Sequence, residues 1–170
     1  MAAAGHDVFF IARGANLAAI KQNGLRVESV HGDLHLPKVN VTDDPKSVGP
    51  VDIVLFAVKL WDTEKAAEQT RPMVGPATRV ITLQNGVDSV ERVAPILGAD
   101  NTIGGVAYIA TTIASPGLIK QTSSFAKMRF GRADKSEDEK LNAFVAAGKA
   151  AKLDVGISSD IERERWEKFI

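Results

Sequence analysis

Apolar residues fall in short runs along the chain, and the run VDIVLFAV at 51–58 organises the prediction. Seven of its eight residues are apolar, without the alternation of a half-exposed strand. Such a run is typical of a strand covered on both faces, as in a parallel sheet flanked by helices. We therefore expect a central strand here, followed by Lys59 and by a helix over 63–70 that Asp62 or Thr63 caps.

The next segment repeats this arrangement. We predict a strand over 78–83, a polar turn at Gln84, Asn85 and Gly86, and a helix from about residue 90. In open α/β sheets, ligands bind outside the carboxyl ends of the strands. Lys59 and Asn85, which each follow a strand, are thus expected at one binding edge.

The rest of the chain continues the alternation of strands and helices. Strands are predicted over 8–12, 102–110, 118–121, 127–130 and 153–157, a hairpin over 25–41, and helices over 16–22, 90–97, 136–152 and 159–170. The strands at 118–121 and 127–130 are expected to be antiparallel and to lie at the edge of the sheet. The predicted class is α/β, with a mostly parallel sheet and an antiparallel extension.

Local signals set the expected helix ends. Asn16 is expected to cap the helix at 16–22, Ser136 with Glu139 to form a capping box, and Asp160 or Ser159 to cap the last helix. A glycine pair at 104–105 would let another group approach the strand backbone closely.

Composition narrows the classes of partner. The 170 residues suit one domain, or one domain and the beginning of another. With 21 basic and 21 acidic residues, the chain has no electrostatic footprint for nucleic acid or an anionic membrane, so small molecules are the expected partners. The absence of cysteine excludes disulfides. No apolar run reaches the roughly 20 residues of a membrane span, and no signal peptide is evident, so a cytoplasmic location is expected.

Two sets of polar residues invite a binding interpretation. Arg13 ends the strand at 8–12, at the place where an arginine pairs with a 2′-phosphate in dinucleotide-binding folds; a solvated arginine is the alternative. His31 and His35 flank a turn without a third ligand at useful spacing, so no metal site is expected.

Six segments, in this order and approximate spacing, resemble the ketopantoate reductase (2-dehydropantoate 2-reductase) family of 6-phosphogluconate-dehydrogenase-like oxidoreductases. They are AGHDVFFIARG, GLRVESVHGDLHLP, FAVKLWDT, TLQNGVDS, GGVAYIATTIASPGLI and RERWEKFI. The resemblance implies a Rossmann-like sheet. Family members start with a further strand and a G-x-G-x-x-G loop, and continue into a helical domain. We therefore expect 1–157 to be a truncated dinucleotide-binding domain and 158–170 to be the first helix leading into a substrate and dimerisation domain.

The resemblance also implies roles for single residues. Arg13 would contact the 2′-phosphate of NADP, Lys59 would lie near the adenosine end of the cofactor, and Ala110 would touch the cofactor. Asn85 would lie near nicotinamide and substrate. Lys168, in a W-x-K pattern, would be the catalytic and substrate-binding lysine.

The chemistry of carbonyl reduction requires such a set. Hydride transfer to a 2-oxo group builds negative charge on the oxygen, so a cationic proton donor must lie within hydrogen-bond reach. Lys168 qualifies if burial lowers its pKa, although its charged neighbours also suit a solvated helix face. Asn85 is also a common turn former. Trp61 and Trp166 are expected to be packing residues.

The function expected from the resemblance is NADPH-dependent reduction of a 2-oxo acid, with 2-dehydropantoate as substrate in pantothenate biosynthesis. The alternatives are a reductase of another 2-oxo acid, or a catalytically inactive nucleotide-binding fragment or interaction module; a homodimer is an open option. A sheet without the family's first strand would leave the strands at 8–12 and 51–58 with unpaired edges. We expect these two strands to pair directly, to recruit another molecule, or to leave the chain poorly stable.

Overall fold

The computed structural model describes every residue of the chain except 169. Its elements fall into two compact units: a larger unit of Val48–Ala107 with Lys127–Ile170, and a smaller unit of Met1–Ser47 with Tyr108–Ala126. Strands alternate with helices and most of the described strand pairs are parallel, which confirms the predicted α/β class. Among the described residues, no helix combines the length and the apolar composition that a bilayer crossing requires.

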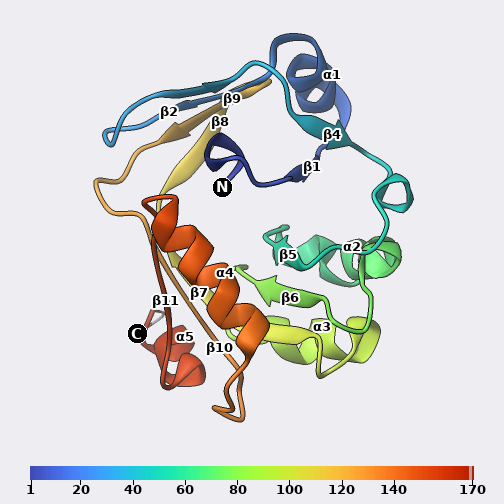
Figure 1. The fold of residues 1–170 in the computed structure, drawn as a ribbon, viewed down its shortest axis with the longest axis vertical. Coiled ribbons are helices and arrows are strands. Elements are labelled where there is room, and N and C mark those ends of the chain that lie inside the picture. The colour runs from blue at the N-terminus through green and yellow to red at the C-terminus, as the bar shows by residue number, and fades with distance from the viewer. Residues whose placement is uncertain (169) are drawn as a thin grey trace. The chain divides into compact units, whose positions relative to one another are not determined.

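The larger unit is built on a five-stranded sheet. Its order is β11 (Asp154–Ile157), β10 (Lys127–Gly131), β7 (Thr102–Tyr108), β6 (Arg79–Thr82) and β5 (Ile53–Phe56) (Figure 1). The pairs β5 with β6, β6 with β7 and β10 with β11 are parallel. The α-helices of this unit are α2 (Thr63–Thr70), α3 (Ser89–Leu97), α4 (Glu139–Ala150) and α5 (Ile161–Glu167), with short 3-10 turns at η3 (Leu60–Asp62) and η4 (Arg71–Met73).

Helices cover both faces of this sheet. Side chains alternate along a strand, so the neighbours Val80 and Ile81 of β6 point to opposite faces, and both are fully buried. Val80 belongs to a core cluster with residues of α2 and α3, whereas Ile81 belongs to a cluster with residues of α4. The first cluster is Phe56, Ala66, Ala67, Val80, Val93 and Leu97; the second is Ile81, Ile103, Phe130, Leu141, Val145 and Val155. This two-sided burial explains the absence of alternation in the strand sequences.

The smaller unit holds two sheets and one α-helix. β1 (Phe9–Ile11) pairs in parallel with β4 (Asn40–Thr42), and the other sheet has the order β3 (Leu34–Leu36), β2 (Leu25–Glu28), β9 (Leu118–Gln121) and β8 (Thr111–Ser115). α1 spans Gly14–Asn23, and η1 (Ala2–Ala4) and η2 (Pro45–Ser47) are 3-10 turns. The predicted hairpin forms between β2 and β3, which are antiparallel, but it ends at Leu36, because the residues predicted to continue its second strand form β4 instead. Gly24 ends α1 with φ +75°, and a Cβ there would lie 2.1 Å from the carbonyl oxygen of Leu36, so only glycine fits.

Two predictions about strand positions are wrong. The strand predicted as central, β5, lies at the end of its sheet, and Leu55 is 46% exposed. The strand at 127–130, β10, lies between two neighbours rather than at an edge, and Phe130 is fully buried. Within the smaller unit β1 pairs with β4, and two of the outcomes expected for these strand edges, recruitment of another molecule or poor stability, stay predictions. Strand β8 was not predicted.

The cap predicted for the first helix is also wrong. α1 begins at Gly14, two residues before Asn16. The side-chain oxygen of Asn16 instead accepts a hydrogen bond from the backbone N–H of Gly117, at 2.8 Å. The side-chain oxygen of Asn16 is therefore used in a tertiary hydrogen bond to Gly117 and not in a cap of its own helix.

Aspartates cap the last two helices. Ser136 was expected to cap α4, but Asp138 takes this position and accepts a hydrogen bond from the N–H of Leu141 at 2.9 Å. Ser136 instead donates its hydroxyl to Asp134, within the preceding loop. At α5 the expected cap is confirmed, because Asp160 accepts from the N–H of Arg163 at 3.1 Å.

Candidate active site

The carboxyl ends of β5 and β6 form one edge of the larger unit's sheet, which we call the carboxyl edge. Phe56 is in register with Thr82, so the loops that follow the two parallel strands leave the sheet together. The first loop carries Lys59, which is exposed, and the second carries Asn85. The sequence therefore placed two of its candidates at the same edge of the sheet.

Gln84 fastens these two loops to each other. Its side-chain nitrogen donates to the carbonyl oxygen of Val58 at 3.0 Å and to the hydroxyl oxygen of Thr63 at 2.8 Å. Thr63 is fully buried and donates in turn to the carbonyl oxygen of Leu60, at 2.7 Å. Gln84 itself is 7% exposed, and its Oε1 is buried without a hydrogen-bond partner. From the sequence Gln84 is expected only as part of a turn; the signal that could have found its role is an amide side chain two residues after a buried strand.

Lys168 and Asn85 are in direct contact, although 83 residues separate them in the sequence. The ammonium group of Lys168 donates a hydrogen bond to Oδ1 of Asn85, at 2.8 Å. Lys168 directly follows α5, and its side chain is half-buried. This burial lowers the pKa of Lys168 from its ordinary value. The contact joins a primary amine of increased acidity to a neutral amide at the carboxyl edge.

The glycine pair in β7 has a packing role that the sequence only suggested. A Cβ on Gly104 would lie 3.2 Å from the side chain of Ile161, the first residue of α5. A Cβ on Gly105 would lie 2.8 Å from the carbonyl oxygen of Thr82 in β6. The groups that approach the backbone closely are therefore α5 and the neighbouring strand. Gly104 lets the helix that leads to Lys168 pack against the sheet.

Arg13 and Ala110 lie in the smaller unit. Arg13 precedes α1 at the end of β1 and is exposed. Ala110 is exposed as well; its N–H donates to the hydroxyl oxygen of Ser123 at 2.9 Å, and its carbonyl oxygen accepts from the N–H of Thr122 at 2.8 Å. Of the predicted site residues, Lys168 and Asn85 are the pair that a described hydrogen bond joins.

Three further expectations about side chains are corrected by their exposure. Trp61 is 79% exposed and Trp166 is 56% exposed, so neither is the packing residue that the sequence suggested. Arg165 lies within the segment that suited a solvated helix face, yet only 2% of it is exposed. Among the described residues, no group of histidine and carboxylate side chains is arranged to hold a metal ion.

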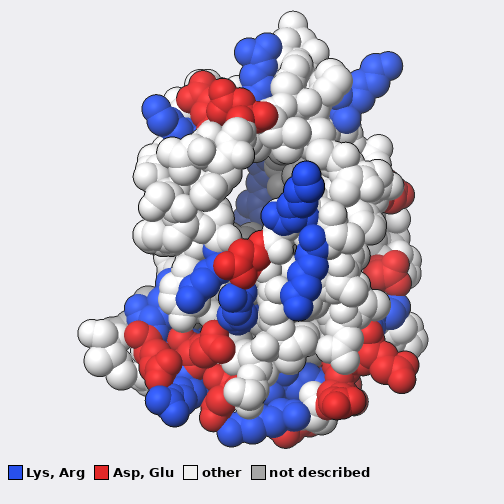
Figure 2. Space-filling view, turned by 60° about the vertical axis from the view of Figure 1, so that its left-hand side comes forward, with Lys and Arg blue, Asp and Glu red and all other residues white. Residues whose placement is uncertain are grey.

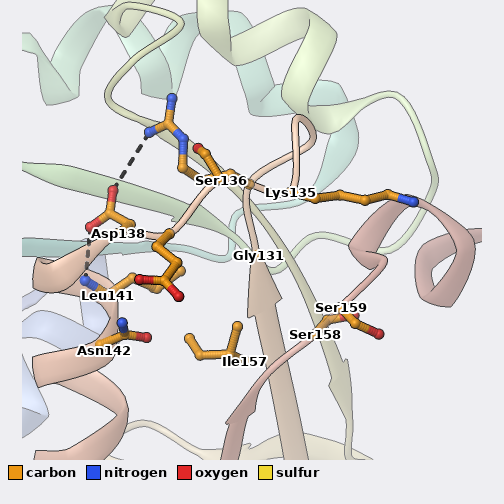
Figure 3. A pocket seen from close by; sticks show the side chains of 11 residues that line it. Gly131, Lys135, Ser136, Asp138, Leu141, Asn142, Ile157, Ser158 and Ser159 are labelled. Carbon is orange, nitrogen blue, oxygen red and sulfur yellow. Dashed lines mark hydrogen bonds and ion pairs between the residues drawn. The ribbon is translucent and has the colours of Figure 1, made fainter.

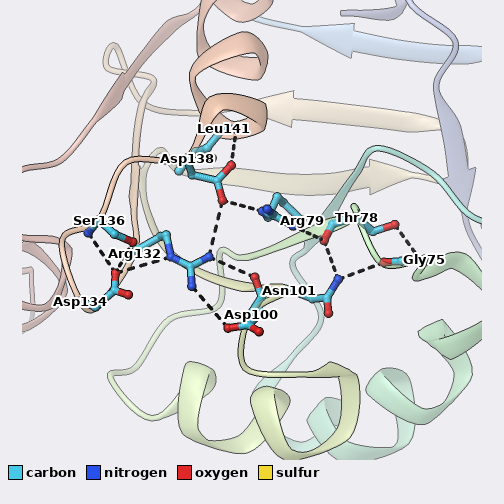
Figure 4. Close-up of polar contacts among 10 residues, drawn as sticks. All are labelled: Gly75, Thr78, Arg79, Asp100, Asn101, Arg132, Asp134, Ser136, Asp138 and Leu141. Carbon is cyan, nitrogen blue, oxygen red and sulfur yellow. Dashed lines mark hydrogen bonds and ion pairs between the residues drawn. The ribbon is translucent and has the colours of Figure 1, made fainter.

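An ion network occupies the opposite edge of the same sheet, at the amino ends of β6 and β7 (Figure 4). Arg79, the first residue of β6, donates to Asp138 at 2.5 Å, and Arg132 lies 3.5 Å from the same carboxylate. Arg132 also donates to the carbonyl oxygen of Asp100, two residues before β7, at 3.1 Å. These contacts fasten the start of α4 to the sheet.

Asp138 is the centre of this network. Burial alone would raise the pKa of its carboxyl group. The N–H of Leu141 and the guanidinium groups of Arg79 and Arg132 outweigh that effect and hold the pKa below its ordinary value. The carboxylate is therefore ionised and paired at neutral pH.

A cavity of about 220 Å³ lies beside this network (Figure 3). Its walls come from the carboxyl ends of β10 and β11 and from the start of α4, and include Arg132, Lys135, Asn142 and Ser158. Neither Asn85 nor Lys168 lines it. On the face that Figure 2 draws, acidic and basic side chains are interspersed, in keeping with the zero net charge. The cavity therefore belongs to the edge that holds the fold together, away from the Lys168 and Asn85 pair.

Known proteins resemble this chain over nearly its whole length. A curated 2-dehydropantoate 2-reductase of Mesorhizobium japonicum is 29% identical, over 96% of this chain and 56% of that protein. The crystal structure of 2-dehydropantoate 2-reductase from Geobacter metallireducens GS-15 matches with a TM-score of 0.91 and 33% identity, over 98% of this chain and 55% of that one. The enzyme of the same name from Porphyromonas gingivalis W83 also matches with a TM-score of 0.91 and 33% identity, over 99% and 60%.

The chain thus spans a little more than half the length of these relatives. Their structures confirm the Rossmann-like fold that the sequence predicted. The profile of the family described as Ketopantoate reductase PanE/ApbA matches residues 1–135 of the 170. This chain belongs to the ketopantoate reductase PanE/ApbA family.

Proposed function

We propose that the protein is an NADPH-dependent reductase of a 2-oxo acid, with 2-dehydropantoate as substrate, pantoate as product and pantothenate biosynthesis as its pathway. The observation that carries the proposal is the contact between Lys168 and Asn85 at the carboxyl edge. The names of the family and of the relatives supply the substrate class.

Lys168 is the proton donor in this proposal. A bound nicotinamide cofactor supplies the hydride that adds to the carbonyl carbon. The carbonyl oxygen gains negative charge as this bond forms, and a proton moves to it from the ammonium group of Lys168. The products would be a 2-hydroxy acid, the oxidised nicotinamide cofactor and a neutral lysine, which regains its proton from solvent. Because burial lowers the pKa of Lys168, the ammonium group gives up its proton more readily than an exposed lysine does.

Asn85 orients the donor. Its Oδ1 accepts one N–H of the ammonium group, which directs the remaining two N–H groups elsewhere. A neutral acceptor suits this role better than a carboxylate, because a negative charge would favour the ammonium form and raise the pKa of the lysine. We therefore assign Asn85 to substrate and nicotinamide positioning, and Lys168 to catalysis and substrate binding.

The cofactor would be held by exposed polar groups after strands of the Rossmann-like fold. Arg13 follows β1 and Lys59 follows β5, and both are exposed cations able to pair with phosphate oxygens. Arg13 is assigned to the 2′-phosphate, which selects NADPH over NADH, and Lys59 to the adenosine end of the cofactor. The exposed Ala110, which has no side chain beyond Cβ, would allow the cofactor to lie close to the backbone.

Cofactor choice is tested by titrating the protein with NADPH and with NADH and following the fluorescence of the dinucleotide. We expect saturable binding that prefers NADPH. Replacement Arg13→Ala should weaken NADPH binding by about tenfold, the loss of one charge-assisted hydrogen bond, and leave NADH unchanged. The control is Arg26→Ala, which removes an exposed arginine from β2 of the same unit.

Substrate choice is tested by following NADPH oxidation with 2-dehydropantoate beside a panel of other 2-oxo acids. The proposal predicts the highest kcat/KM with 2-dehydropantoate. Turnover of a different 2-oxo acid alone would show that the protein is a reductase of that acid and not of 2-dehydropantoate. A folded protein that binds neither dinucleotide would contradict the reductase assignment altogether.

A further inference from the structure

Arg165 is a buried arginine on a helix whose other charged residues are exposed or only partly buried. Its side chain is 2% exposed, whereas that of Arg163 on the same helix is 75% exposed. The buried residues of α5 are Ile161 and Arg165, which lie four positions apart and so share one face of the helix. One apolar and one cationic side chain of this short helix are thus buried against the rest of its unit, and Glu164 also accepts a hydrogen bond from the hydroxyl of Ser158 at 2.7 Å.

The guanidinium group of Arg165 reaches the segment that follows Asn85. Nη2 donates to the carbonyl oxygen of Val87 at 2.5 Å and lies 3.4 Å from the hydroxyl oxygen of Ser89. On the same helix, Nη1 donates to the carboxylate of Glu162 at 2.7 Å, and a carboxylate oxygen of Glu91 in α3 lies 3.7 Å from Nη2. Two carboxylates thus neutralise the buried charge, while the backbone contact joins α5 to the loop between β6 and α3.

The contacts of Arg165 join the same two segments of the chain as the Lys168 and Asn85 pair proposed for catalysis. Arg165 precedes Lys168 by three residues, and Val87 follows Asn85 by two. The same two segments are therefore joined twice, once by Arg165 with Val87 and once by Lys168 with Asn85. We propose that Arg165 is a positioning residue, which fixes the rotation and height of α5 so that Lys168 meets Asn85. This inference rests on the proposed function, because it assigns the role through Lys168.

The chemistry of arginine suits this role. The Ile161 contact is apolar and has little directional preference, so by itself it allows the helix to slide or turn. A guanidinium group has a planar, rigid set of donors, so its bonds to Val87 and Glu162 fix one orientation. A buried ion pair adds little stability compared with an apolar side chain of similar size. Methionine should therefore fill the site of Arg165 and keep the fold, while losing the directional bonds.

The test compares Arg165→Met with the matched control Arg163→Met, in which an exposed arginine on the same helix is replaced. Both are assayed for 2-oxo acid reduction with NADPH, and thermal unfolding confirms that each is folded. We expect Arg165→Met to lower kcat about tenfold to a hundredfold, the size of effect that small misplacements of a catalytic group produce. The KM for NADPH should change less than about twofold, because Arg165 touches no proposed cofactor residue. Arg163→Met should keep the wild-type kcat.

A double-mutant cycle separates positioning from a general structural role. If Arg165 acts through the Lys168 and Asn85 contact, Asn85→Ala already removes what Arg165 secures. The double variant should then have the kcat of Asn85→Ala within about twofold. Effects that multiply would overturn the inference, as would a wild-type kcat in folded Arg165→Met.

Two further variants keep the test decisive. If Arg165→Met does not fold, Arg165→Lys replaces it, since lysine keeps the charge but lacks the planar donors. We then expect a severalfold lower kcat, and a wild-type kcat would overturn the inference.

Lys168→Ala shows whether a negative result concerns the positioning role of Arg165 or the proposed function itself. Full activity in Lys168→Ala would remove the proposed catalytic role and the inference with it. An inactive Lys168→Ala beside a fully active Arg165→Met would overturn the positioning role alone.

Discussion

The two edges of the larger unit's sheet use polar side chains differently. At the amino ends of β6 and β7, Arg79 and Arg132 each form a charge pair with Asp138, and the pKa of Asp138 is lowered. At the carboxyl edge, Lys168 contacts a neutral amide, and burial lowers its pKa. A paired carboxylate that stays ionised suits stability, whereas a lysine of lowered pKa suits proton transfer. The comparison separates residues that hold the fold from residues that could act on a substrate.

The largest expected effect is at the carboxyl edge. Lys168→Ala removes the proposed proton donor and should lower kcat about a thousandfold, within the range measured for general acids. Stability should change by less than about 1 kcal/mol, because the side chain is only half-buried and its hydrogen bond to Asn85 is to a neutral group. Steady-state NADPH oxidation and thermal unfolding measure the two quantities. Lys149→Ala, at an exposed position in α4, is the control and should leave both unchanged.

At the opposite edge, which holds Asp138, substitutions should lower stability and leave kcat unchanged. Asp138→Ala removes the cap of α4 and leaves Arg79 without its carboxylate, so the free energy of unfolding should fall by about 3 kcal/mol. Urea unfolding measures this loss. Asp134→Ala, which removes an exposed carboxylate 3.5 Å from Arg132, should cost less than about 1 kcal/mol. A loss of kcat in folded Asp138→Ala would contradict the claim that this edge of the sheet serves stability alone.

An intermediate effect is expected at Gln84, which belongs to the carboxyl edge but serves to fasten its loops. Gln84→Leu removes the bonds to Val58 and Thr63 and should cost about 1 to 2 kcal/mol of stability. Because the buried Oε1 is lost as well, the cost should stay at the lower end of this range. The KM for NADPH should rise, since the loop that carries Lys59 is no longer held. An unchanged KM together with lower stability would restrict Gln84 to a structural role.

The smallest effect concerns the pH dependence of stability. The folded pKa of Asp138 lies below its ordinary value of 3.8, so its contribution to stability is present above that value and is lost as the pH falls through the folded pKa. Asp138→Asn cannot ionise and has no such contribution. The difference in unfolding free energy between wild type and Asp138→Asn should therefore be constant near neutral pH and shrink below about pH 4. A difference that grows in acid would contradict the pairing.

The sequence predicted the positions of most strands and of the hairpin along the chain, because local patterns of apolar residues determine them. The apolar runs located the strands on both sides of Lys59 and Asn85, and they located the hairpin that β2 and β3 form. The helix caps were harder, because Ser136 and Asp138 are both good caps within three residues and only the fold decides between them. The position of β10 depends on pairing with β11, which lies beyond a whole helix in the sequence.

Some residues of the candidate site could likewise be predicted from the sequence, and others could not. Asn85 was found by its place after a strand and by resemblance to a family, and Lys168 by the resemblance alone; the structure shows that the two are in contact. The burial of Arg165 could not be predicted, because IERERWEK has the composition of a solvated helix and the partners Val87 and Glu91 lie about 75 residues earlier. Gln84 was missed because its two acceptors, Val58 and Thr63, belong to the loop after β5 and to the start of α2, more than 20 residues earlier.

The central claim is that Lys168 at the carboxyl edge gives up a proton during reduction, and the pH profile of kcat tests it most directly. Because the ammonium form is the active one, kcat should fall as the pH rises through the pKa of Lys168, at a pH below the ordinary lysine value of 10.5. The residual activity of Lys168→Ala should lack this fall. A profile that is flat to pH 10.5, or the same fall in Lys168→Ala, would contradict the account.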